Sequence, residues 1–170
     1  MKLHKSMTVN YVHYEKGDEI SAWKIYPFFL IHMLMFGGTC FMMAYFSGDD
    51  VPLFFMFIHG GIAILAYVVF YFAIFGKDEV KWMFINAGLG LFGIYVEIDW
   101  LLALGGKQLS DYSLLTHVFP FLYYILYTFL IRQMFIDIFK ARENENRLAA
   151  VNNLYIIISV IVYLSIYFLK

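Results

Sequence analysis

The sequence has little charge, little proline and almost no cysteine. Only 15% of its 170 residues are charged, whereas an average soluble domain has about 25%. Because so few polar side chains cannot cover a soluble domain of this size, the composition excludes a soluble enzyme and a disordered chain. The single cysteine, Cys40, excludes an intrachain disulfide, a disulfide scaffold and a cysteine-based metal motif.

Motifs of soluble enzymes are also missing. The chain has no HExxH, DxD or GxSxG motif, and no glycine-rich phosphate loop precedes a predicted helix. Residues 1–19 lack the apolar core of a signal peptide, so we expect the first apolar segment to be retained as a membrane span. The net charge of −1 provides no general attraction for nucleic acid.

Long apolar segments dominate the remainder, since 62% of the residues are apolar and 21% are aromatic. A helix needs about 20 such residues to cross a bilayer. Segment 82–104 is long enough although it carries Glu97 and Asp99, and four other segments contain no Asp, Glu, Lys or Arg. We therefore predict an all-α polytopic membrane protein with a polar N-terminal arm, residues 1–24, and a five-helix domain, residues 25–170. The predicted spans are 25–47, 51–76, 82–104, 112–139 and 148–169.

The distribution of basic residues predicts the orientation of these spans. With the N-terminus in the cytoplasm, only Lys107 and Lys170 fall outside, and the other ten of the twelve Lys and Arg residues fall inside. The prediction is N-in and C-out, in the inner (plasma) membrane of a bacterium. We further expect the fourth helix to extend into the cytoplasm through Arg132 to Arg147, with Gln133 and Asp137 among its solvated positions.

Ionisable residues inside membrane spans are costly and mark candidate functional sites. At 1.5 Å per residue, four of them fall in the outer third of three spans: Glu97, Asp99, His59 and His117. An acidic rim would lie just above them: Asp49, Asp50 and Asp111. Such a layer predicts a hydrated vestibule that relays protons or binds an ion. In the alternative interpretation the two acids are interfacial, and the histidines bind backbone carbonyls or tyrosine hydroxyls.

Two further patterns are compatible with a function. His59 and His117 lie at similar depth on different helices, as the axial ligands of a b-type haem would, although the sequence favours no cofactor. Tyr155, Ser159, Tyr163 and Tyr167 form a polar stripe on the last span, which we expect to bridge helices. Arg132 is expected to reach lipid headgroups.

Three functions remain open at this point. The first is an oligomeric channel or transporter component that moves an ion, a proton or a small solute, because a pore forms more easily between protomers than within five short helices. The second is a non-transporting membrane subunit or sensor whose residues 1–24 and 132–147 bind a cytoplasmic protein. The third is a haem redox protein.

Overall fold

A computed structural model describes residues 1–9, 11–48 and 51–169. Within these residues the chain is helical apart from a short N-terminal hairpin. Four helices are long and apolar enough to cross a membrane, or five if the bent helix α3 counts as one span, so the chain has the architecture of a membrane protein. The elements are β1 (Met7–Val9), β2 (Val12–Tyr14), α1 (Ala22–Phe46), α2 (Leu53–Phe75), α3 (Lys77–Leu104), the 3-10 helix η2 (Leu109–Asp111), α4 (Leu114–Ile138) and α5 (Glu145–Leu169).

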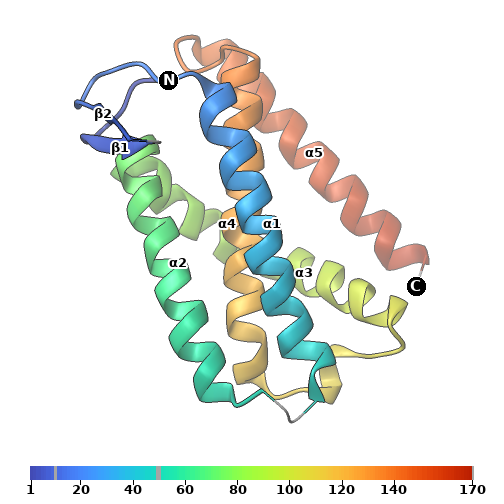
Figure 1. The fold of residues 1–170 in the computed structure, drawn as a ribbon. Helices are drawn as coiled ribbons and strands as arrows, with labels where there is room; N and C mark the ends of the chain where they lie inside the picture. The colour runs from blue at the N-terminus through green and yellow to red at the C-terminus, as the bar shows by residue number, and fades with distance from the viewer. Residues whose placement is uncertain (10, 49–50, 170) are drawn as a thin grey trace.

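The helices form a bundle around α4, which lies beside α1 and α2 (Figure 1). One end of the bundle, called the arm end here, holds the N-terminal arm, the α2–α3 junction and the α4–α5 loop. The C-terminus of α1, the N-terminus of α2 and η2 lie at the opposite end, called the far end. The basic residues of the arm and of the two junctions are therefore together at one end.

The N-terminal arm packs onto the bundle. Leu3 and Ile20 are buried, and β1 pairs with β2 in an antiparallel hairpin. The backbone N–H groups of His4 and Lys5 both donate to the carbonyl of Ala73, at 2.9 and 3.2 Å. Because the last carbonyls of a helix have no partner within it, these bonds satisfy the end of α2 and fix the arm to it.

The core between α1, α2 and α4 combines large aromatic side chains with glycines. The buried Tyr71 hydroxyl donates to the Leu126 carbonyl at 3.1 Å, which joins α2 to α4. A Cβ atom at Gly60 would lie 2.7 Å from Cδ1 of Phe119, so α2 approaches α4 closely here only because residue 60 has no side chain. By contrast, α5 directs most of its side chains outward, with Val151 its one buried hydrophobic residue in the described part of the chain.

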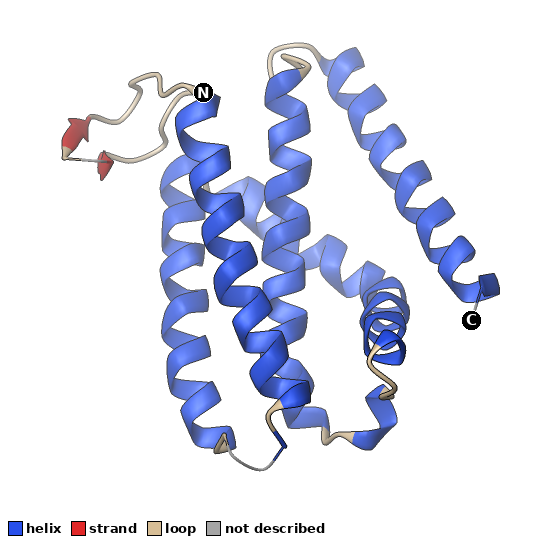
Figure 2. Ribbon diagram, turned by 45° about the vertical axis from the view of Figure 1, so that its right-hand side comes forward, coloured by secondary structure: helices blue, strands red, loops and turns tan. Residues whose placement is uncertain are grey.

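Helix α3 is bent, which differs from the continuous span predicted at 82–104. Its parts Lys77–Gly88 and Gly90–Leu104 meet at an angle of 69°, and the second part turns away from the bundle axis (Figure 2). Glycines flank the break, and glycine weakens a helix because it leaves the backbone unrestrained. The predicted range 82–104 lies within this helix, but periodicity and composition do not show its bend.

The fourth helix does not extend to Arg147. It ends at Ile138, Lys140 adopts a left-handed conformation with φ of 49°, and α5 already begins at Glu145. Gln133, predicted to be solvated, is fully buried. The predicted extension of the fourth helix through Arg147 was therefore wrong. Gln133, predicted to be solvated, instead contacts Glu79 of α3.

Candidate functional site: a polar cavity between α3, α4 and α5

A cavity of about 650 Å³ lies between α3, α4 and α5. Its volume falls within the range of small-molecule sites, about 300–1,000 Å³. Half of the side chains that line it are polar, an unusual composition inside a group of apolar helices. The polar lining residues are Glu79, Asn86, Tyr124, Thr128, Arg132, Asn152, Tyr155, Ser159 and Tyr163, and the others include Trp82, Ile125, Phe129, Ile156 and Val160.

The charged groups of the cavity are all at its arm end. Arg132 on α4 places Nη1 at 3.3 Å from Oε2 of Glu79 on α3. The same guanidinium donates from Nε and Nη2 to Oδ1 of Asn152 on α5, at 3.1 and 2.8 Å. One arginine therefore connects the three helices that form the cavity.

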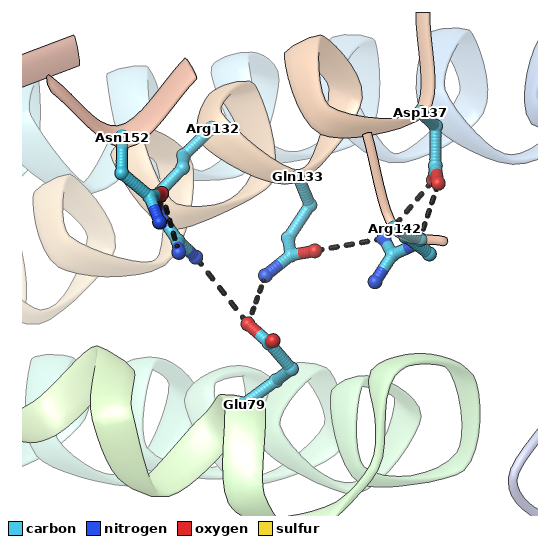
Figure 3. Close-up of polar contacts among 6 residues, drawn as sticks. All are labelled: Glu79, Arg132, Gln133, Asp137, Arg142 and Asn152. Atoms are coloured by element: carbon cyan, nitrogen blue, oxygen red, sulfur yellow. Dashed lines mark hydrogen bonds and ion pairs between the residues drawn. The ribbon is translucent and has the colours of Figure 1, made fainter. Parts of the chain in front are cut away.

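Gln133 connects this arginine cluster to a second one (Figure 3). Its Nε2 donates to Oε2 of Glu79 at 2.7 Å, and its Oε1 accepts from Nη2 of Arg142 at 2.8 Å. Arg142 also donates to both carboxylate oxygens of Asp137, at 2.5 and 3.1 Å, and the hydroxyl of Tyr26 on α1 donates to the same carboxylate. This network holds four helices together at the arm end.

Further from the arm end the cavity is lined by hydroxyl groups. Tyr155, Ser159 and Tyr163 of the polar stripe on α5 face α3 and α4 here, so the stripe lines a cavity in addition to packing between helices. Glu97 lies on the second part of α3 and is not among the lining residues. None of the four predicted site residues lines this cavity in the described part of the chain.

The two histidines make local contacts elsewhere. His59 is exposed on α2, where its Nδ1 lies 3.2 Å from the carbonyl oxygen of Phe55. Nδ1 of His117 on α4 lies 2.9 Å from the hydroxyl of Tyr45 on α1. A backbone carbonyl and a tyrosine hydroxyl are the partners that the alternative interpretation expected for these histidines.

The acids at the far end act on the backbone. Asp99 is buried, and its Oδ1 accepts the N–H of Leu109 at 3.0 Å, which fixes η2 to α3. Asp111 is exposed and accepts the N–H of Gln108 at 2.9 Å as part of a capping box on η2. The other members of the predicted acidic rim, Asp49 and Asp50, lie outside the described residues.

The described part of the chain does not hold a metal cluster, since no group of three or more His, Cys, Asp and Glu side chains gathers there. A haem between His59 and His117 does not fit either. Gly60 follows His59 and packs against Phe119, where even one added carbon atom would lie 2.7 Å from the ring. In the part of the chain that the structure describes, the close contact of α2 with α4 leaves no space for a macrocycle beside Gly60.

Sequence reasoning placed the candidate site at the far end and missed the cavity. Arg132 was expected to reach lipid, and Glu79 received no role, because the partner of each lies more than 50 residues away in the chain. The one available signal was a pair of opposite charges on the predicted inner side: Glu79 just before the predicted span 82–104, and Arg132 towards the inner end of the span 112–139. Comparison of the chain with protein-family models, with curated proteins and with solved structures found no match.

Proposed function

We propose that this protein transports a small polar or amphiphilic solute across a membrane, with the cavity between α3, α4 and α5 as its binding site. The observation that carries the proposal is a polar cavity of about 650 Å³ among helices long and apolar enough to span a bilayer. Polar groups are costly inside the hydrocarbon layer, so a cavity lined by them indicates a site for a polar ligand.

The bend in α3 supports the same proposal. Asn86 and Gly90, on either side of the break, both line the cavity. Interrupted helices are tolerated in membranes where the break lines a cavity or is buried in protein, and transporter binding sites commonly use them. The bend thus lies where a transported solute would meet backbone groups.

The orientation and the role of Glu97 are parts of the proposal. The basic residues at the arm end favour a cytoplasmic N-terminus. The proposal also keeps two predictions made from the sequence, a location in a bacterial plasma membrane and assembly as a homo-oligomer. The role of Glu97 as the residue that exchanges a proton during transport is retained from the sequence, because it is an acid within a predicted span.

The test is a flux measurement on the purified chain in liposomes. Proton uptake, osmotic swelling with a panel of ions and neutral solutes, and translocation of a chain-labelled phospholipid cover the solute classes that the cavity admits. We expect at least one flux above that of protein-free liposomes. Ser159→Trp, which fills the cavity, should reduce this flux at least tenfold, because the added indole occupies the solute's space.

The matched control places the same side chain on the other side of the helix. Ile161 is 57% exposed on α5 and does not line the cavity, so Ile161→Trp should leave the flux unchanged. Equal flux through the Ser159→Trp and unsubstituted proteins, with both folded, would contradict the proposal. So would liposomes that remain as tight as protein-free ones for every probe.

A second function, a membrane subunit with a cytoplasmic partner, is favoured by the hairpin alone. Tyr11 is fully exposed and Val12 is 51% exposed, outside the helices. Residues 132–142 support this function less, because their polar groups bind one another. Tyr11→Asp should abolish co-purification of a partner without unfolding the arm, whereas deletion of residues 1–20 would also remove the buried Leu3.

A further inference from the structure

We infer that the ligand of the cavity is a lipid-linked zwitterion, an amphiphile that carries an ammonium group next to a phosphate or carboxylate. Its charged group would bind Glu79 and Arg132, and its acyl chain would lie along α5. This inference rests on the proposed function and uses the same site.

The charges at the arm end of the cavity select a zwitterion. Glu79 and Arg132 lie side by side, with 3.3 Å between Oε2 and Nη1. A ligand with a single charge would meet one like charge at this site, whereas an ammonium next to an anion meets two opposite charges. Both side chains are partly accessible, with 34% of Glu79 and 17% of Arg132 exposed.

Both side chains also keep hydrogen-bonding capacity for a ligand. Oε2 of Glu79 accepts from Arg132 and Gln133, while Oε1 has no hydrogen-bond partner within the described residues. Three N–H groups of Arg132 are engaged, and a guanidinium has five. Oε1 is thus available to an ammonium group, and the two remaining N–H groups to an oxyanion.

An aromatic ring completes the ammonium site. Trp82 follows Glu79 by three residues on α3, so both lie on one face of the helix, and both line the cavity. The indole is 56% exposed. A tryptophan face attracts ammonium groups, and this ring is on the same face of α3 as the carboxylate that would bind the same group.

The rest of the cavity suits an acyl chain. Beyond the charged end its walls include Ile125, Phe129, Ile156 and Val160. Ile156 and Val160 are 58% and 47% exposed, so on a membrane-spanning helix this wall also faces lipid. The volume accommodates a headgroup and part of one chain, and the remainder of the chain can continue into the bilayer. The linkage to lipid follows from this open apolar side.

The experiment compares three probes with the purified full-length chain in detergent, by native mass spectrometry. Lysophosphatidylethanolamine carries the zwitterion and a chain, lysophosphatidylglycerol carries an anion and a chain, and phosphoethanolamine carries the zwitterion alone. We expect a one-to-one complex with the first probe, at least tenfold tighter than with either of the others. Glu79→Gln should abolish the preference for the zwitterionic lipid over the anionic one. Glu143→Gln, at an exposed carboxylate of the α4–α5 loop, should retain it.

A second measurement does not depend on a change at Glu79. The chain has three tryptophans, so Trp23→Phe with Trp100→Phe leaves Trp82 as the only one. Lysophosphatidylethanolamine that carries bromine near the headgroup end of its chain should then quench most of the Trp82 fluorescence, and unlabelled lipid should restore it by competition. Absence of quenching would overturn the inference, as would equal binding of the two lipids.

The outcomes separate the inference from the proposed function. Flux that Ser159→Trp blocks, together with no preference for the zwitterionic lipid, overturns the inference and leaves transport standing. Tighter binding of free phosphoethanolamine than of its lipid overturns the linkage to a chain. Binding of the lipid as expected, without flux of any probe, supports the ligand assignment and contradicts transport.

Discussion

The buried amide of Gln133 offers the sharpest test of the polar network at the arm end. Gln133→Leu keeps a similar volume and removes two hydrogen bonds, one to Glu79 at 2.7 Å and one from Arg142 at 2.8 Å. Both partners are charged, and a hydrogen bond to a charged group contributes about 1.5–3 kcal/mol. Gln133 is fully buried, so water cannot replace it as the partner.

The expected loss of stability follows from these contacts. Two such bonds, offset by about 1–2 kcal/mol for the buried leucine, leave a decrease of about 1–5 kcal/mol in the free energy of unfolding. The low end of this range applies if the remaining bonds of Arg142 to Asp137 and of Glu79 to Arg132 compensate the two charges.

The assay is equilibrium unfolding in mixed micelles with increasing sodium dodecyl sulfate, followed by far-UV circular dichroism. Asn153→Leu is the control, because Asn153 is an exposed amide on α5, and exposed substitutions change stability by about 0.5 kcal/mol or less. A Gln133→Leu protein as stable as this control would refute the network. It would mean that the helices at the arm end are not joined through Gln133.

Two further predictions concern helix contacts. Gly93→Ala should lower the unfolding free energy by about 1–3 kcal/mol, because a Cβ atom there would lie 2.4 Å from the Tyr163 ring. Gly88→Ala is the control and should not destabilise the protein, because the space around Gly88 is open. Equal effects of the two substitutions in the same unfolding assay would show that α5 does not pack on α3 in this way. Asp99→Ala should lower the thermal unfolding temperature in detergent, since the buried N–H of Leu109 loses its acceptor at a cost of about 1–3 kcal/mol. Asp99→Asn keeps an acceptor and should restore most of the loss, and a failure to do so would assign Asp99 another role.

The amino-acid sequence alone was enough to establish a membrane protein built of long apolar helices. Runs such as 51–76 have no charge to interrupt them, and burying that much apolar surface requires a bilayer. Helix positions were also predictable within a few residues, since polar residues bound each run. The observed α2, Leu53–Phe75, lies within its predicted range.

The contacts between polar side chains of different helices could be identified only in the folded chain. Hydropathy gives the depth of a residue along a helix but not the direction of its side chain, so residues at equal depth, such as His59 and His117, were grouped although each makes its own local contact. The bend in α3 and the outward position of α5 open the cavity, and both depend on packing between helices. Arg132 binds Glu79 and Asn152 in this cavity. A charge that is removed from water is stable only when it is paired, and these two partners lie on different helices.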